Sequence, residues 1–134
     1  KGPDNLWSIG NNKYIAIECK NQVATSRSEI IKTEIGQMAN HRGWFEKNYP
    51  NATCSYIFVH QTNKIADNAN PTFPIKVFTY DVLEELKNRT LSFVRSFSKY
   101  EISSITEETV SAELQANILM PNDIIQLAKM AKSN

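Results

Sequence analysis

Two short apolar segments joined by a tight turn constrain the fold of this chain more than any other feature. Residues 6–9 have the composition of a β-strand, and they end at the Gly-Asn-Asn sequence of residues 10–12, which is typical of hairpin turns. Residues 13–20 form a second strand candidate, in which alternation puts Glu18 and Lys20 on the face opposite to the isoleucines. We therefore expect two antiparallel neighbouring strands that carry charged groups at one end.

The rest of the chain alternates between helix and strand patterns. Ser26 and Glu29 have the spacing of a capping box, which predicts a helix over residues 28–48. Its apolar positions recur with the period of a helix that covers a core: Ile31, Ile35, Met38 and Phe45. Further strands are expected over residues 53–61 and 75–79, and further helices over residues 81–97, from Thr106 onward, and over residues 121–131. This order predicts a mixed α/β domain with helices packed on a sheet of about four strands.

Length and charge limit the class of protein. A chain of 134 residues forms one domain and leaves little room for a second. Its 15 Lys and Arg residues almost balance its 14 Asp and Glu residues, and a net charge of +1 is too small for nucleic-acid binding by bulk electrostatics alone. No apolar run approaches the ~20 residues of a membrane-spanning helix, and nothing indicates secretion, so we expect a cytoplasmic protein that does not bind membranes. Because the sequence starts with Lys1 rather than Met, we also expect it to be a fragment of a larger protein.

Three charged side chains converge at one end of the predicted hairpin. Asp4 precedes the first strand, and Glu18 and Lys20 lie near the end of the second. Two carboxylates that lie close together repel each other, and a divalent cation relieves that repulsion. Carboxylate oxygens suit Mg²⁺ or Mn²⁺, and a neighbouring lysine can assist an attacking water or stabilise charge that develops on phosphorus. Together these residue types indicate hydrolysis of a phosphodiester.

The same residues resemble the active-site motif of a nuclease superfamily. The Pro-Asp pair that ends at Asp4, followed by Glu18-Cys19-Lys20 at the end of an apolar strand, looks like the motif of the PD-(D/E)XK nucleases, which have the restriction-endonuclease-like fold. The resemblance covers residues 2–79, because a helix bearing Gln37 and a further strand follow in the family's order. The C-terminal helices fit it only loosely.

The resemblance implies a role for each motif residue. Asp4 and Glu18 would bind the metal, Mg²⁺ or Mn²⁺, and the backbone carbonyl of Cys19 would be a third ligand. Lys20 would be the catalytic lysine, and Gln37 would help to position Lys20, water or a phosphate.

Two features depart from the family's usual pattern. A tyrosine often follows the glutamine by four residues, and this chain has His41 at that position. The family also usually begins with a helix, and the present sequence starts too late to contain one.

The implied activity is that of a metal-dependent nuclease that hydrolyses phosphodiester bonds, in DNA rather than RNA. Residues 1–100 would form the nuclease-like core, and residues 101–134 a C-terminal helical extension of the same domain. Because the net charge is close to zero, other domains of the parent protein or a homodimer partner would supply most of the substrate affinity, as in a restriction or defence system. Local contacts to nucleic acid are expected from polar and basic residues around the cleft: Lys13, Arg27, Lys32, His41 and Arg42.

Other interpretations stay open at this point. The three charged groups could form an exposed cross-strand ion pair worth well under ~1 kcal/mol. A catalytically inactive module with the same fold could bind nucleic acid or protein instead, and an unrelated α/β interaction domain would carry these charges on its surface. Cys19 and Cys54 are expected to be buried thiols on neighbouring strands.

Overall fold

The structure is a computed structural model in which residues 1–20 and 26–133 are described. The chain divides into two compact units. The first contains Lys1–Tyr80 and the C-terminal segment from Ala128, and the second contains Asp81–Leu127. The expected division into a core of residues 1–100 and an extension of residues 101–134 stays a prediction. Within the described residues, every helix is too short or too polar to cross a lipid bilayer.

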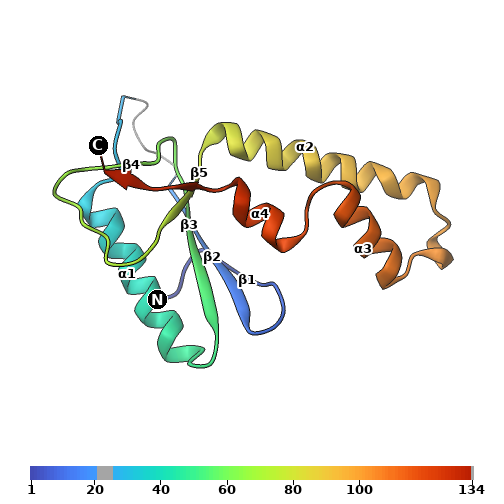
Figure 1. Cartoon of the computed structure of the whole chain (residues 1–134), viewed down its shortest axis with the longest axis horizontal. Helices are drawn as coiled ribbons and strands as arrows, with labels where there is room; N and C mark the ends of the chain where they lie inside the picture. Colours follow the sequence, from blue (N-terminus) through green and yellow to red (C-terminus); the bar gives the residue numbers. More distant parts are fainter. Residues whose placement is uncertain (21–25, 134) are drawn as a thin grey trace. The chain divides into compact units, whose positions relative to one another are not determined.

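The first unit is built on a mixed sheet, which confirms the predicted α/β class (Figure 1). Its strands are β1 (Asn5–Ser8), β2 (Lys13–Cys19), β3 (Thr53–Val59), β5 (Lys76–Phe78) and β6 (Lys129–Met130). They pair in the order β1-β2-β3-β5-β6, in which β2, β3 and β5 are parallel and the two outer strands are antiparallel to their neighbours. Two further short strands, β4 (Lys64–Ile65) and β7 (Lys132–Ser133), form a separate parallel pair.

The predicted hairpin is confirmed, and its register brings Asp4 opposite Glu18. The last pair in the β1–β2 ladder is Asn5↔Ile17, and one further step in the same register sets Asp4 against Glu18. At the turn, residues 10–12 have φ angles of 85°, 54° and 55°. Glycine and asparagine adopt this left-handed conformation more readily than other residues, so the turn sequence determines the register of the hairpin.

The sheet has five strands within the described residues rather than the predicted four. The difference arises at residues 129–130, which form β6 although a helix was predicted over residues 121–131. Helix α4 ends earlier, spanning Pro121–Leu127. The chain then runs beside β5, and the N–H of Ala131 donates to the carbonyl of Ile75 at 2.9 Å. This pairing satisfies backbone groups of β5 that would otherwise form an open sheet edge.

The predicted start of the first helix is wrong, because α1 spans Lys32–Asn48. Ile30 is fully buried and instead forms an isolated parallel bridge with β4. The N–H of Ile31 donates to Oε2 of Glu34 at 3.0 Å. Glu34 therefore satisfies a free N–H at the helix start, and the predicted Ser26–Glu29 capping box lies outside the helix.

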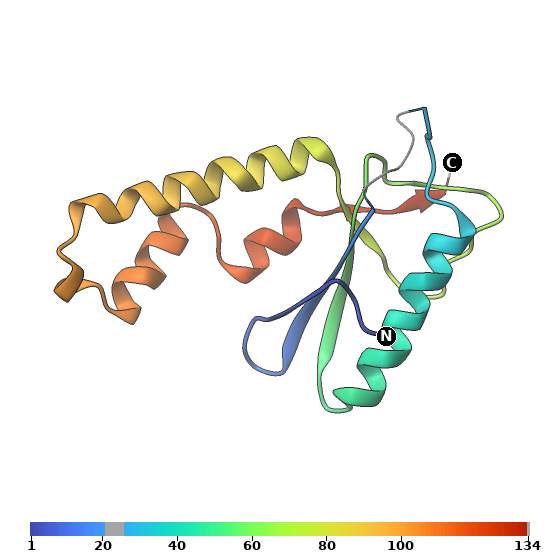
Figure 2. The same ribbon diagram turned by 180° about the vertical axis from the view of Figure 1, so that it is seen from behind.

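Helix α1 lies along the sheet in both views (Figures 1 and 2), on the face that carries Glu18. Phe45 of α1 contacts the rings of Tyr14 and Tyr56, with centroid distances of 5.5 and 6.5 Å. Of the four predicted apolar positions of the helix, Ile31 is 38% exposed and the other three are buried. The core cluster between helix, sheet and connecting loops consists of Ala16, Ile30, Ile35, Met38, Tyr56, Phe58, Ile65, Ala66, Ala69, Ile75 and Val77. Glu18 therefore extends from the same strand face as part of the main core.

The second unit is helical. It contains most of α2 (Tyr80–Ser96), two short 3₁₀ turns (Phe97–Lys99 and Ile102–Ser104), α3 (Glu107–Ala116) and α4. The predicted helix start at Thr106 is confirmed, since its Oγ1 accepts a hydrogen bond from the N–H of Thr109 at 3.3 Å. The buried carboxylate of Glu113 accepts hydrogen bonds from the Tyr100 hydroxyl and from the Lys99 ammonium, both at 2.8 Å. These contacts join α3 to the segment that follows α2.

Candidate active site

Asp4 lies just before β1, and its carboxylate reaches across to the second strand. Its Oδ2 accepts a hydrogen bond from the backbone N–H of Cys19 at 2.9 Å. Asp4 and Glu18 line the same pocket, so their side chains reach the same side of the hairpin. The N-terminal segment also lies close to α1, because a Cβ on Gly2 would be only 3.1 Å from the ring of Trp44.

Lys20 directly follows β2 and contacts two side chains from different elements. Its Nζ lies 3.1 Å from Oε1 of Glu18 and also donates to Oε1 of Gln37 on α1. The side chains of Lys20 and Glu18 are only 15% and 12% exposed, so water screens this ion pair weakly. The N–H of Lys20 donates to the carbonyl of Val59 at 3.0 Å, which continues the β2–β3 ladder and restrains its backbone.

His41 contacts the other oxygen of the Glu18 carboxylate. Its Nε2 lies 2.9 Å from Oε2 of Glu18. The two atoms are close enough for an ion pair but are poorly aligned for a hydrogen bond, and neither has another hydrogen-bond partner among the described residues although both are buried. On the other side of the ring, Nδ1 lies 3.4 Å from the carbonyl oxygen of Lys1. The Glu18 carboxylate thus lies between a lysine and a histidine.

An open pocket of about 370 Å³ connects these groups. It is lined by Lys1, Gly2, Asp4, Glu18, Gln37, Asn40 and His41. Gln37 and His41 reach it from one face of α1 because they are four residues apart. Lys20 does not line the pocket itself but contacts two of its walls, Glu18 and Gln37. The structure therefore brings the four predicted catalytic residues together at one end of the sheet.

The donor atoms suit a divalent cation, although the described residues include no complete metal site. No three His, Cys, Asp or Glu side chains among them lie close enough together to hold an ion. Asp4 uses Oδ2 to bind the Cys19 amide, and Glu18 and His41 are the closest pair of potential ligands. The unsatisfied Oε2 of Glu18 and Nε2 of His41 are the observation that fits a cation, because carboxylate and imidazole donors both bind divalent metals.

The predicted nucleic-acid contacts do not gather around this pocket. Of the five, only His41 lines it. Lys13 starts β2 and is about 16 Å from Glu18 along the strand, by the usual rise per residue. Lys32 is exposed in the first turn of α1. Lys13 and Lys32 are therefore accessible to a ligand, but not at the candidate active site.

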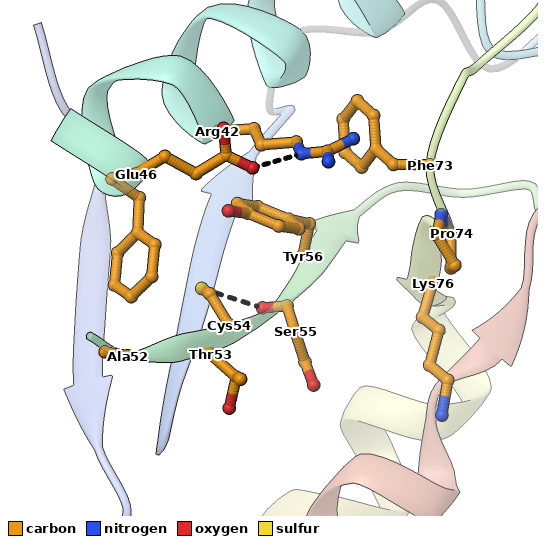
Figure 3. Close-up of a pocket in the computed structure, with 11 residues that line it drawn as sticks. Arg42, Glu46, Ala52, Thr53, Cys54, Ser55, Tyr56, Phe73, Pro74 and Lys76 are labelled. Atoms are coloured by element: carbon orange, nitrogen blue, oxygen red, sulfur yellow. Dashed lines mark hydrogen bonds and ion pairs between the residues drawn. The ribbon is translucent and has the colours of Figure 1, made fainter. Parts of the chain in front are cut away.

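Arg42 lines a different pocket, of about 450 Å³, which Figure 3 shows. Its Nε donates to Oε1 of Glu46 at 2.7 Å, and its guanidinium lies 4.9 Å from the centroid of the Phe73 ring. Arg42 follows His41 directly, and a helix turns by about 100° per residue, so the two side chains leave α1 in different directions. In the same pocket, burial raises the pKa of Cys54 to about 11, which keeps this thiol protonated at neutral pH.

Cys19 is exposed, which corrects the prediction of two buried thiols. It ends β2, and its side chain alternates to the face opposite to Glu18. Partial burial and the negative charges of Asp4 and Glu18 raise the pKa of its thiol, against the effect of Lys20. Proximity to these charged groups therefore does not activate Cys19 as a nucleophile.

A cluster of the buried residues Glu34 and His60 with the partly buried Arg27 lies next to the candidate site, and no sequence pattern indicated it. Nη2 of Arg27 contacts Oε1 of Glu34 and lies 3.1 Å from Nε2 of His60, which is itself 3.5 Å from Oε2 of Glu34. His60 is fully buried, and its Nδ1 accepts a hydrogen bond from the N–H of Thr62 at 3.2 Å. Burial, with the charges of Arg27 and Lys20, lowers the pKa of His60 against the opposing effect of Glu34, so the ring is neutral at neutral pH. The predicted contact residue Arg27 is thus held by an internal carboxylate.

A scan against protein-family models, a search of curated proteins and a search of solved structures each found no match to this chain. The resemblance to the PD-(D/E)XK nucleases therefore depends on the motif residues of the sequence.

Proposed function

We propose that the chain is a metal-dependent nuclease domain that hydrolyses phosphodiester bonds, in DNA rather than RNA. The observation that carries this proposal is the position of Lys20, whose ammonium group contacts Glu18 and Gln37 beside the pocket lined by Asp4. An ion pair that is largely withdrawn from water contributes little net stability, because its desolvation costs about as much as its attraction gains. Its presence at a pocket therefore favours a chemical role over a structural one.

Each residue of the candidate site would have its own role in the reaction. Asp4 and Glu18 would hold the cation, with the backbone carbonyl of Cys19. When bound, Mg²⁺ or Mn²⁺ lowers the pKa of a coordinated water and neutralises charge on the phosphate. The ammonium of Lys20 would orient the attacking water or stabilise the charge that develops on the phosphate oxygens. Gln37 would restrict the positions that this ammonium can take.

The near-neutral charge supports a domain that depends on a partner for substrate affinity. With a net charge of +1, the chain can neutralise few phosphates by itself. A further domain of a longer protein or a second copy of the chain would supply most of the binding. An effector domain in a restriction or defence protein would meet this description.

Cleavage assays with matched variants test the proposal. Supercoiled plasmid and single-stranded DNA are incubated with Mg²⁺ or Mn²⁺ and the wild-type chain, Asp4→Ala, Lys20→Ala or Lys47→Ala. Lys47 is exposed near the end of α1 and serves as the control. We expect cleavage by the wild type and the control, and a loss of at least a hundredfold for the other two variants. Activity that survives both Asp4→Ala and Lys20→Ala would refute the assignment of these residues.

One observation favours a second function, that of an inactive nuclease-like module that binds nucleic acid or protein. No three potential ligands come together in the described parts of the chain, and Lys20 already neutralises one oxygen of Glu18. Calorimetry with Mn²⁺ separates the two functions. A nuclease site should bind the ion and lose it in Glu18→Gln, whereas an inactive module should show no binding that depends on Glu18.

A further inference from the structure

A second polar pocket lies at the same end of the sheet as the candidate active site. It has a volume of about 500 Å³ and is lined by Ser26, Arg27, Ser28, Gln61, Thr62, Lys64 and Tyr80. β2 and β3 are parallel and in register, with Cys19 opposite Val59. The residues that follow β3 therefore leave the sheet beside Lys20, and two of them, Gln61 and Thr62, reach this pocket.

The lining groups suit an oxyanion. Four hydroxyls, one side-chain amide, a guanidinium and an ammonium line the pocket, and no carboxylate is among its lining residues in the described chain. Such donors recognise phosphate through hydrogen bonds and charge. The exposed ring of Tyr80, at 53% exposure, adds an apolar surface at the edge.

Internal hydrogen bonds hold the pocket walls. Gln61 Nε2 donates to the carbonyl oxygen of Arg27, which joins one wall to the other. The N–H of Lys64 donates to Oγ1 of Thr62 at 3.2 Å, and its carbonyl accepts from the N–H of Ile30 at 2.7 Å. The pocket is therefore preorganised, which lowers the entropic cost of binding a ligand.

The charged side chains around the pocket do not cancel, and one positive charge is left uncompensated. Glu34 compensates Arg27 from behind, and His60 is neutral. Lys64 makes no ion pair with any residue that the structure describes. In addition, Nε of Arg27 is buried and lacks a hydrogen-bond partner within the described segments. Lys64 is therefore the cation available to a bound anion, and the Arg27 guanidinium beside it adds positive charge that Glu34 compensates only from one side.

We propose that this pocket binds a backbone phosphate of the nucleic-acid substrate, next to the phosphate that is cleaved. The inference rests on the proposed nuclease function and names a subsite for its substrate. Glu34 and Gln37 are separated by about 4.5 Å along α1, so the contacts behind this pocket adjoin those that hold Lys20. A strand that enters the active site can therefore place a neighbouring phosphate at Lys64 and Arg27, with its sugar or base against Tyr80.

Binding measurements over a range of salt concentrations test the subsite. Fluorescence anisotropy of a labelled single-stranded oligonucleotide is recorded with the full chain in EDTA, between about 50 and 200 mM salt. Lys64→Gln should reduce the slope of log Kd against log salt by about 0.7, the value for one phosphate contact on a single strand. Lys47→Gln, at the far end of α1, should leave the slope unchanged. Ser28→Ala should weaken binding roughly two- to tenfold without a change in slope, because it removes an uncharged donor.

Each result decides the proposal. An unchanged slope in Lys64→Gln, equal losses in Lys64→Gln and Lys47→Gln, or no binding of the oligonucleotide at any salt concentration would reject the subsite. Amide NMR titrations distinguish the source of the phosphate. Shifts at residues 26–28 and 61–64 with inorganic phosphate but not with the oligonucleotide would identify a site for free phosphate and also reject it.

Cleavage assays keep this result separate from the nuclease proposal. Because Asp4 lies outside the pocket, Asp4→Ala should abolish cleavage and retain the slope of the wild type. Binding that depends on Lys64 without any cleavage would support the subsite and reject the nuclease. Cleavage by a chain in which Lys64→Gln does not change binding would support the nuclease and reject the subsite.

Discussion

Lys20 and Gln37 come from different elements of the fold, and Nζ of Lys20 donates a hydrogen bond to Oε1 of Gln37. The same ammonium lies 3.1 Å from Glu18, so two acceptors restrict its position. A long lysine side chain loses rotamer entropy when it is held in this way. The geometry therefore identifies Gln37 as a residue that positions Lys20.

Gln37→Ala should reduce cleavage more than it reduces stability. Loss of one acceptor should lower the free energy of unfolding by about 1 kcal/mol, measured by urea denaturation. The cleavage rate should fall by about ten- to a hundredfold, as for other residues that orient a catalytic group. Gln37→Glu keeps an acceptor for Lys20 and should recover part of the rate. The control is Gln115→Ala, an exposed glutamine on α3, and an equal cleavage rate in Gln37→Ala and this control would contradict the role.

The contact between His41 and Glu18 leads to a prediction about metal preference. Imidazole nitrogen binds Mn²⁺ better than it binds Mg²⁺, which prefers oxygen ligands. A cation at 100 times its Kd should stabilise the fold by about 2.7 kcal/mol, which thermal unfolding detects. In His41→Ala, the stabilisation by Mn²⁺ should decrease while that by Mg²⁺ is largely retained.

Two further variants complete the metal test. Glu18→Gln should abolish stabilisation by both ions, because it removes the anionic ligand. The control is Glu84→Gln, which changes an exposed glutamate on α2 and should keep the stabilisation by Mn²⁺ and by Mg²⁺. Equal stabilisation of His41→Ala and the wild type by Mn²⁺ would show that the imidazole is not a ligand.

Features encoded by local spacing were predictable from the sequence. The turn at residues 10–12 and the alternation along β2 are set by neighbouring residues, and both led to the hairpin that brings Asp4 opposite Glu18. The sequence also has His41 four residues after Gln37, and this spacing puts the two side chains on one face of α1. These short-range rules account for most of the candidate site.

Features that depend on distant contacts were not predictable in the same way. Ile30 lies outside the helix that was predicted over residues 28–48, because it pairs with β4. Residues 129–130 lie outside the helix that was predicted over residues 121–131, because they pair with β5. The contact of His60 with Arg27 and Glu34 joins three separate segments, and each residue alone resembles an ordinary surface or strand residue. Backbone pairing and burial override local propensity at these positions.

Glu34→Gln should destabilise the first unit. The change leaves the partly buried guanidinium of Arg27 without its carboxylate and weakens the contact that caps α1 through the Ile31 N–H. Because Arg27 keeps 28% exposure, water offsets part of the loss, and we expect about 1–3 kcal/mol in the free energy of unfolding. Urea denaturation measures this value. The matched variant Glu46→Gln affects an exposed pair with Arg42 and should cost less than about 1 kcal/mol, so equal losses would contradict a structural role for the cluster.

Glu113 should make the free energy of unfolding of the second unit decrease at low pH. Hydrogen bonds from Lys99 first, and then from Tyr100 and Ser96, lower the pKa of its carboxyl from 4.5 to about 2. A lowered pKa in the folded state means that the carboxylate contributes its full stabilisation above about pH 4.5 and loses it as the pH falls toward about 2.

Glu113→Gln tests this dependence. The variant should unfold at a lower urea concentration at pH 7, and it should lose less stability than the wild type between pH 7 and about pH 3, because the titrating group is absent. Circular dichroism of the helices follows the transition. Glu101→Gln, an exposed glutamate near the same turn, should match the wild type at both pH values. If Glu113→Gln and the wild type lost the same stability on acidification, the hydrogen bonds to Lys99 and Tyr100 would not hold the carboxylate in its charged form.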